Sequence, residues 1–398
     1  MKRAESRGPL VALWMRVVYF YNQQLRYVAY LLYSPIHIAE VRSSVASAVG
    51  ELREVEECGP GFPLIIHATG GTTAAAVELV ERCGARGAVL VGFGEHNSFA
   101  SALHTRAELE ARGLPAVAFH CPSYRNCREE LTKARRVADA ASSLLGAKAV
   151  LIGRETAQAR ILRERFGWLV EVVPLEEFEK VVDSSAPDAE ALAVFGDERV
   201  AKIAAALSQY AAGADVVAIQ CFPFLMKRRY TPCLSIAVLN SRGATVACEG
   251  DLASGFLMLM ARGLAGSSGW IANVVKYTGA EGVFAHCTIS LDMAKSWRVT
   301  THFESGFPYG LAAELKERVY TVVSISPRLD RAALGRVEVI KSGNYLQDAC
   351  RTQASVKFNR PVRLEAEAPA NHHVFIPGDV VEEAGAVFKL LSIPAVLY

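Results

Sequence analysis

The alternation of strand-like and helix-like segments between residues 26 and 290 restricts the fold of this chain more than any other feature. Short apolar runs bounded by Gly or Pro are typical of buried strands, and amphipathic stretches of helical period separate them. The first four such runs cover 26–35, 62–73, 87–98 and 115–123. Strands that alternate with helices of this length favour a parallel sheet covered on both faces. We therefore predict an α/β fold with doubly wound parallel sheets.

The chain of 398 residues is too long for one ordinary hydrophobic core, so several domains are expected. A second series of strands and helices starts near 147, and after about 285 short alternating strands replace the helix pattern, as in a β-barrel. We predict four parts: an N-terminal extension at 1–25, a first α/β domain at 26–146, a second α/β domain at 147–285, and a β-rich, barrel-like C-terminal domain with a final helix at 286–398.

The charge balance excludes some partners. The 43 basic and 41 acidic residues give a net charge of +2, so nothing electrostatic favours nucleic acid or an acidic membrane surface. The apolar run near the N-terminus is too short for a membrane span, which needs about 20 residues, and no small-residue cleavage site follows it. We expect neither a nucleic-acid nor a membrane partner.

The nine cysteines are an odd number and contain no C-x-x-C pair. This pattern argues against a zinc ribbon and against a disulfide framework. Most of them lie in apolar surroundings, where cysteine acts as a small buried side chain. A reducing, cytoplasmic location is therefore expected.

Two glycine-rich turns follow predicted strands, in the segments HATGGTTA and VGFGEHNS. Turns of this kind bind ligands in α/β sheets, although glycine is also needed wherever the backbone must adopt a positive φ. Neither turn contains the G-x-G-x-x-G fingerprint of dinucleotide-binding proteins. A nucleotide-binding oxidoreductase is therefore disfavoured.

The segment CEGD at 248–251 places Glu249 and Asp251 two residues apart at the end of a predicted strand, ahead of an apolar helix. Residues at i and i+2 share one face of a strand, so their like charges repel unless a cation lies between them. The alternative is that they favour the N-terminus of the following helix through its dipole. Both interpretations stay open at this point.

Several segments together resemble the L-fucose/L-arabinose isomerase superfamily, and in particular its short fucose-isomerase-like branch. They are HATGGTTA, GEHNSFASAL, AIQCFP, CEGDLASGFLMLM, FAHCT, THFESG, CRTQ and NHHVFIPGD, which extend from about residue 26 to the C-terminus. The resemblance implies two α/β domains followed by a β-rich domain. It also implies aldose–ketose isomerisation with a divalent cation, typically Mn²⁺, in a homo-oligomer, possibly a trimer or hexamer.

The resemblance assigns the metal ligands to Asp251 and His373, with Glu249 as a third, and places Gln220 and Asn97 at the substrate. Moving a carbonyl group from C1 to C2 of a sugar removes a proton from carbon and forms an enediolate. A cation that chelates both oxygens would stabilise this charge, while carboxylates move the proton. Carboxylate and imidazole ligands together favour Mn²⁺ over Mg²⁺.

One feature departs from the family pattern, because no Asp or Glu occurs between Asp215 and Glu249, where the resemblance implies a further catalytic carboxylate. Either Glu249 or Glu304 replaces it, which makes the expected catalytic residues Glu249, Asp251 and Glu304. Otherwise the protein binds a sugar without isomerase activity.

Two histidines, His286 and His302, follow the acidic segment on strand-like stretches. Each is either a hydrogen-bonded core histidine or a group that binds sugar hydroxyls or moves a proton. Cys287 is the chain neighbour of His286, and neighbours in a strand face opposite sides, so we do not expect a nucleophilic pair. The sequence thus predicts a carbohydrate isomerase-like protein for a free sugar, with the non-catalytic sugar binder as the alternative.

Overall fold

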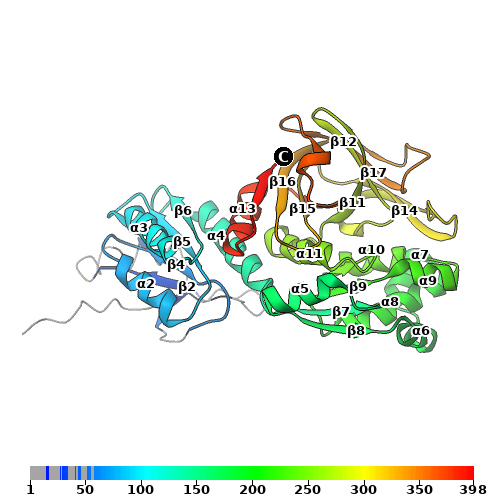
Figure 1. Ribbon diagram of the computed structural model, residues 1–398, viewed down its shortest axis with the longest axis horizontal. Helices are drawn as coiled ribbons and strands as arrows, with labels where there is room; N and C mark the ends of the chain where they lie inside the picture. Colours follow the sequence, from blue (N-terminus) through cyan, green and yellow to red (C-terminus); the bar gives the residue numbers. More distant parts are fainter. Residues whose placement is uncertain are drawn as a thin grey trace, which may run out of the picture. The chain divides into compact units, whose positions relative to one another are not determined.

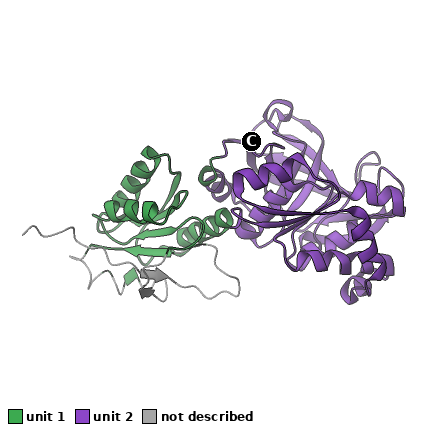
Figure 2. Cartoon of the chain, turned by 60° about the horizontal axis from the view of Figure 1, so that its bottom comes forward, with its two compact units in different colours: residues 1–142, 389–392 green, residues 143–388, 393–398 purple. Residues whose placement is uncertain are grey.

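The computed structural model of the protein describes residues 58–398 continuously, and before them only 15–17, 27, 29–34, 41, 44–45 and 52–54 (Figure 1). Most of the predicted extension at 1–25, and most of the helix expected from 36 onward, therefore lie outside the described residues. The chain forms two compact units, which Figure 2 distinguishes by colour. Unit 1 comprises Met1–Ser142 with Lys389–Ser392, and unit 2 comprises Ser143–Phe388 with Ile393–Tyr398.

Unit 1 is built on a parallel sheet, as predicted. Its strands, in spatial order, are β3 (Leu52–Glu54), β1 (Met15–Val17), β2 (Ala29–Leu32), β4 (Leu64–His67), β5 (Ala88–Phe93) and β6 (Ala116–Cys121). The last four are parallel to one another, and β1 is antiparallel to both of its neighbours. The helices are α2 (Thr73–Arg82), α3 (Ser98–Ala111) and α4 (Arg128–Ser143). β2, β4 and β5 are buried along their whole length, which explains their continuous apolar sequence.

Two disulfide bonds in unit 1 correct the cysteine prediction. Cys58 is bonded to Cys83 and Cys121 to Cys127, so four of the nine cysteines are paired. The chain folds bring together cysteines that are 25 and 6 residues apart, and no spacing motif reveals such contacts. Disulfides persist mainly in oxidising compartments, so they count against the reducing location that we expected, which stays a prediction. Within the part of the chain that the structure describes, no helix has the length and apolar character to cross a membrane.

Unit 2 begins with a second parallel sheet of four strands, which again confirms the predicted α/β pattern. Their spatial order is β10 (Val246–Ala247), β9 (Val216–Ile219), β7 (Lys148–Ile152) and β8 (Leu169–Val173). Its helices are α5 (Ala157–Phe166), α6 (Leu175–Ser184), α7 (Ala189–Phe195), α8 (Glu198–Ala211), α9 (Cys221–Arg228), α10 (Cys233–Ser241) and α11 (Leu252–Ala265). α5 and α11 pack together, while α6 and α10 pack on α8.

The rest of unit 2 contains the predicted β-barrel. Six antiparallel strands close on themselves in the order β15 (Val319–Ile325), β18 (His372–Pro377), β11 (Trp270–Thr278), β12 (Glu281–His286), β17 (Thr352–Phe358) and β16 (Ala332–Gly343). A short strand, β19 (Ala395–Leu397), pairs with β16 in parallel. β13 (Ala294–Thr301) and β14 (Pro308–Leu315) form a separate antiparallel pair. The barrel begins at Trp270, ahead of the predicted boundary at 286, and it belongs to the same compact unit as the second parallel sheet.

The two helices of the C-terminal region are α12 (Leu364–Glu367) and α13 (Val381–Leu390). α13 is the predicted final helix. The stretch at 361–369 lies in the region after about 285, for which the sequence predicts short strands, and its centre is helical instead. Its central residues Leu-Glu-Ala-Glu are good helix formers, and Ala and Glu are depleted in strands, so one helical turn forms between the flanking prolines.

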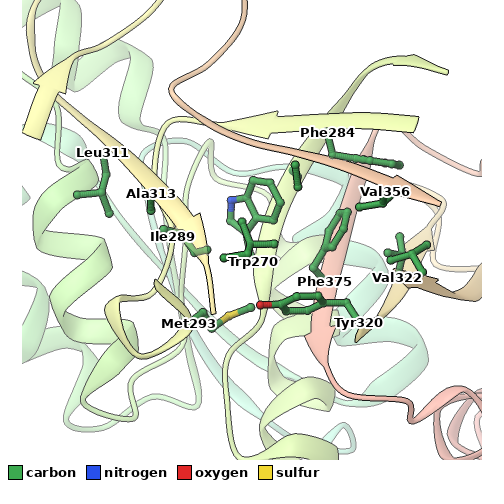
Figure 3. Close-up of a cluster of buried hydrophobic side chains, with 14 of the residues drawn as sticks. Trp270, Phe284, Ile289, Met293, Leu311, Ala313, Tyr320, Val322, Val356 and Phe375 are labelled. Atoms are coloured by element: carbon green, nitrogen blue, oxygen red, sulfur yellow. The ribbon is translucent and has the colours of Figure 1, made fainter. Parts of the chain in front are cut away.

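The barrel encloses an aromatic core (Figure 3). Trp270, Phe284, Tyr320 and Phe375 are almost fully buried there, and the rings of Trp270 and Phe284 both pack against Phe375. α11 lies between this barrel and the second parallel sheet, because it contacts β15 and β18 on one side and β9 and β10 on the other (Figure 1). A helix that is covered on all sides must be apolar all round, as this one is.

Candidate metal site

Three side chains from three elements of unit 2 converge beside the N-terminus of α11. Glu249 follows β10, His286 ends β12, and His372 begins β18. One ligand atom of each lies within 4.8 Å of the others, so the three together can hold a metal ion. Nε2 of His286 is 3.4 Å from Oε1 of Glu249, and Nε2 of His372 is 3.5 Å from Oε2. We call these three residues the metal triad.

A tight turn aims Glu249 into this cluster. β10 ends at Ala247, so Glu249 and Asp251 do not lie on one face of a strand, as the sequence suggested. Glu249 and Gly250 instead have positive φ values of 59° and 65°. A Cβ atom on Gly250 would lie 2.6 Å from Cγ of Gln220, so only glycine fits the second position. The positive φ of Glu249 is a conformation that such residues rarely adopt, and it is common at functional sites.

Asp251 caps α11 and also orients one histidine of the triad. Its Oδ1 accepts hydrogen bonds from the backbone N–H groups of Ala253 and Ser254, each at 3.1 Å, and from Nε2 of Gln158 at 3.0 Å. Its Oδ2 lies 2.7 Å from Nδ1 of His372. Both oxygens are thus occupied by protein donors. Asp251, which the sequence also predicts as a direct ligand, thus caps the helix and contacts His372. Glu249 is the carboxylate of the pair that belongs to the metal triad.

The charges in this cluster stabilise one another. Burial opposes ionisation of both carboxyls, but the pKa of each lies below its usual value. For Glu249 the hydrogen bond and charge of His286 and the charge of His372 outweigh burial, and for Asp251 the hydrogen bond and charge of His372 and the hydrogen bonds of Ser254 do so. Burial likewise opposes protonation of His372, and the hydrogen bond to Asp251 outweighs it, so the pKa of His372 is raised. Both carboxylates are therefore negative at neutral pH, as cation binding requires.

The structure does not bring His373, the predicted ligand, to the carboxylates. Its side chain is fully buried on the opposite face of β18, where its ring meets Phe284 edge-on. Its Nε2 lies 2.8 Å from the hydroxyl of Tyr398, and its Nδ1 lies 2.9 Å from the carbonyl oxygen of Asn371. Because neighbouring residues of a strand face opposite sides, only one histidine of the pair can reach the metal triad, and it is His372.

His286 is in contact with two thiols. Sγ of Cys248 lies 3.8 Å and Sγ of Cys287 3.7 Å from its Nδ1. We had expected Cys287 to face away from His286, as strand neighbours do. β12 ends at His286, however, so the alternation of the strand does not extend to Cys287.

Three further predicted site residues, His302, Glu304 and Gln220, lie outside the metal triad. His302 is buried, with Nε2 4.0 Å from Oε2 of Glu304. Burial lowers the pKa of His302, and the charge of His286 lowers it further. The Gln220 side chain exchanges hydrogen bonds with the backbone of Arg154. Its Cγ lies against Gly250, in the turn that carries Glu249.

Asn97 belongs to unit 1, whereas the metal triad lies in unit 2. It lines a cavity of about 470 Å³ between the starts of α2 and α3, together with Gly70, Gly71 and His96. Asn97 has a positive φ of 55°, a backbone conformation that asparagine adopts more readily than most residues.

A cavity of about 260 Å³ opens beside the triad. Glu249, Asp251 and His372 line it, together with three amide side chains that we did not predict: Gln158, Asn273 and Asn371. Nδ2 of Asn371 donates a hydrogen bond to Oδ1 of Asn273. The Thr156 helix cap fixes Gln158 in the first turn of α5, but no sequence signal connects that turn with Asp251, 93 residues away.

A comparison of the chain with protein-family models and with curated proteins finds no match.

Proposed function

We propose that this protein is a metal-dependent aldose–ketose isomerase that acts on a free sugar through an enediolate. The observation that supports the proposal is the convergence of Glu249, His286 and His372 beside a cavity lined with carboxylate and amide groups. The cavity also has apolar lining residues, among them Leu257, Ile325 and Pro327, and its carboxylate and amide groups can orient a hydroxyl-rich ligand. The reaction itself is taken from the resemblance to the fucose-isomerase-like branch, while the site offers the metal ligands and the cavity beside them.

The donor atoms of the triad fit a divalent transition metal. One carboxylate and two imidazoles suit Mn²⁺, Fe²⁺ or Zn²⁺ better than Mg²⁺, which prefers oxygen ligands and water. We propose Mn²⁺ as the physiological ion. When bound, it would supply positive charge for the enediolate oxygens.

The protein residues have separate roles in this proposal. Glu249 and His286 hold the ion directly, and His372 holds it through Nε2 while Asp251 fixes its ring. Asn273 and Asn371 offer amide groups to the sugar hydroxyls. Glu249 and Glu304 are the two candidates for proton transfer. Glu304 is about half exposed and does not line the 260 Å³ cavity, so Glu249 is the better placed of the two.

The alternative is a sugar-binding protein without catalysis. In that case Glu249 serves as a ligand alone, and Asp251, the other carboxylate that lines the cavity among the described residues, has both oxygens engaged by protein donors. We propose in addition that the protein forms a homo-oligomer, which analytical ultracentrifugation at micromolar concentration tests. We also propose a cytoplasmic location, against which the two disulfides of unit 1 count.

The decisive experiment combines metal analysis with a screen for ketose formation. The purified protein is analysed for bound metal and then incubated with aldopentoses and aldohexoses in the presence of Mn²⁺. The His286→Gln variant should lose both metal and turnover. Glu281→Gln, at the exposed start of the same strand, should lose neither. Metal binding without any ketose would support the sugar-binding alternative, and wild-type protein that binds no divalent metal would contradict the proposal.

A further inference from the structure

Buried thiols lie beside the metal triad, and two of them, Cys248 and Cys287, contact His286. Unit 2 contains all five cysteines that are outside disulfides, namely Cys221, Cys233, Cys248, Cys287 and Cys350, and the first four are buried. Two of them are in direct contact, because Sγ of Cys233 lies 3.5 Å from Sγ of Cys287. Cys287 is also the chain neighbour of the triad residue His286, and its sulfur is 3.7 Å from Nδ1 of that imidazole.

The backbone around this thiol pair is fixed on both sides. Cys233 is the first residue of α10, and its carbonyl oxygen accepts a hydrogen bond from the Thr288 hydroxyl at 2.7 Å. The carbonyl oxygen of Cys287 accepts one from the N–H of Leu311 at 3.0 Å. The carbonyl oxygen of Thr288 in turn accepts a hydrogen bond from Nε1 of Trp270 at 3.0 Å. The two sulfurs are therefore held next to each other by the fold and are 54 residues apart in the chain.

We propose that Cys233 and Cys287 form an oxidation site at which a peroxide converts the two thiols into a disulfide and thereby disables the metal triad. The second half of this inference depends on the metal site that we propose above. The first half depends only on the geometry of the two sulfurs.

The oxidation balances with hydrogen peroxide as the oxidant. One sulfur attacks the peroxide, the O–O bond breaks, and a sulfenic acid and one water molecule form. The second sulfur then attacks the sulfenic sulfur, the S–O bond breaks, and a second water molecule leaves with the disulfide in place. The two sulfurs together lose two electrons, the peroxide gains them, and the two thiol protons end in the two water molecules.

The new bond would displace His286. A disulfide has an S–S length of about 2.05 Å, so sulfurs that start 3.5 Å apart must approach by roughly 1.5 Å. Part of this movement passes to Cys287 and, through the peptide bond, to His286. The 3.4 Å distance between His286 and Glu249 depends on that backbone position. Disturbing the support of a metal ligand typically weakens metal binding by about 10–100-fold.

The test uses the full chain. The reduced protein is treated with hydrogen peroxide, its free thiols are alkylated, and the peptides are analysed by mass spectrometry under non-reducing conditions. Mn²⁺ affinity is measured by electron paramagnetic resonance before the treatment, after it, and after addition of a thiol reductant. We expect a peptide that links Cys233 to Cys287, a loss of Mn²⁺ affinity of about tenfold or more, and recovery on reduction.

Two variants separate this mechanism from general oxidative damage. Cys233→Ala removes one partner and should keep its Mn²⁺ affinity after peroxide treatment. Cys350→Ser is the matched control, because Cys350 is unpaired and the most accessible of the five thiols, and it should respond like the wild type. If no link between Cys233 and Cys287 forms in folded wild-type protein, or if Cys233→Ala loses affinity as the wild type does, the inference is overturned.

The test also distinguishes failure of the proposed function. Reduced protein that binds no Mn²⁺ contradicts the metal site and, with it, the coupling between oxidation and metal binding. The linked peptide in the same sample would still establish the oxidation site. Normal Mn²⁺ binding without a linked peptide would leave the metal site intact and overturn only the oxidation site.

Discussion

Nδ1 of His372 lies 2.7 Å from Oδ2 of Asp251, while Nε2 of the same ring points to Glu249 at a distance of 3.5 Å. A hydrogen bond from one ring nitrogen to a carboxylate fixes the tautomer and leaves the other nitrogen free for a metal. In the proposed metal site, Asp251 is therefore the group that orients His372. The cap that it provides to α11 fixes the carboxylate itself.

This relationship predicts that Asp251→Asn weakens metal binding without unfolding the protein. Asparagine caps helices about as well as aspartate, so α11 should keep its N-terminus. It lacks the negative charge that holds His372, and the affinity for Mn²⁺ should fall by about 10–100-fold. Isothermal titration calorimetry measures this change.

Asp188→Asn, the same substitution at the cap of α7, serves as the control and should leave the affinity unchanged. Equal affinities in all three proteins would show that Asp251 does not act through His372.

The adjacent histidines should respond to substitution in opposite ways. His372→Gln should abolish Mn²⁺ binding, because it removes one ligand of the metal triad. His373→Gln should keep Mn²⁺ binding but lower the free energy of unfolding by about 1–3 kcal/mol, because it leaves the buried hydroxyl of Tyr398 poorly paired. Thermal melting and metal titration of both variants test the pair. Loss of metal in His373→Gln alone would reverse our assignment.

The sequence predicts the elements of this fold better than it predicts which residues meet. Continuous apolar runs identify strands such as β4 and β5, since these strands are buried on both faces. Burial on both faces also prevents a prediction of which histidine, His372 or His373, faces the site. Four consecutive residues of β18, from His373 to Ile376, are buried, so apolar and polar residues do not alternate and the strand carries no mark of which face meets the site.

The contacts of Gln158 and of the cysteine pairs could not be predicted from the sequence for a related reason. Gln158 reaches Asp251 across 93 residues, and Cys233 reaches Cys287 across 54. Contacts of this kind depend on how α5, α10 and α11 pack against the sheets, and a single sequence does not contain that packing. The acidic segment was recognisable because Glu249 and Asp251 are close in the chain, although the turn that separates their roles was not.

The backbone at Glu249 should store a measurable cost in stability. A non-glycine residue with a φ of 59° destabilises the folded state by about 1–2 kcal/mol relative to the usual backbone regions. Glycine avoids this cost, but it lowers stability by about 0.4–1 kcal/mol because it raises the entropy of the unfolded chain. Glu249→Gly should therefore be more stable than Glu249→Gln by about 0.5–1 kcal/mol. Both variants should lose Mn²⁺ binding.

Chemical denaturation of the two Glu249 variants gives this difference directly. Substitutions at Glu281 provide the comparison, because that residue begins β12 in an ordinary strand. There the glycine variant should be the less stable of the two, since glycine weakens strands. If glycine destabilises both positions equally, the left-handed conformation of Glu249 carries no cost.

His67 should make unit 1 sensitive to acid. It ends β4 and is fully buried, and the hydroxyl of Thr72 lies 2.7 Å from its Nδ1. That hydroxyl donates its own proton to the carbonyl oxygen of Thr69, so it must accept a proton from Nδ1. Nε2 is then the unprotonated nitrogen, and among the described residues it has no hydrogen-bond partner. Burial lowers the pKa of His67 from 6.5 to about 3.

The sign of the pH effect follows from proton uptake. Between pH 6.5 and about 3 the unfolded chain protonates this histidine and the folded chain does not, so stability falls as the pH decreases through this range and is complete above pH 6.5. The slope approaches about 1.4 kcal/mol per pH unit, and the loss at pH 5 amounts to roughly 2 kcal/mol relative to neutral or higher pH. Hydrogen–deuterium exchange of the β4 amides, corrected for the intrinsic rates, should show this loss in the wild type. His67→Gln should not show it, whereas His104→Gln, which removes an exposed histidine of α3, should behave like the wild type. Parallel pH profiles for the wild type and His67→Gln would mean that the folded protein accommodates a proton on Nε2, contrary to the buried environment that the structure gives it.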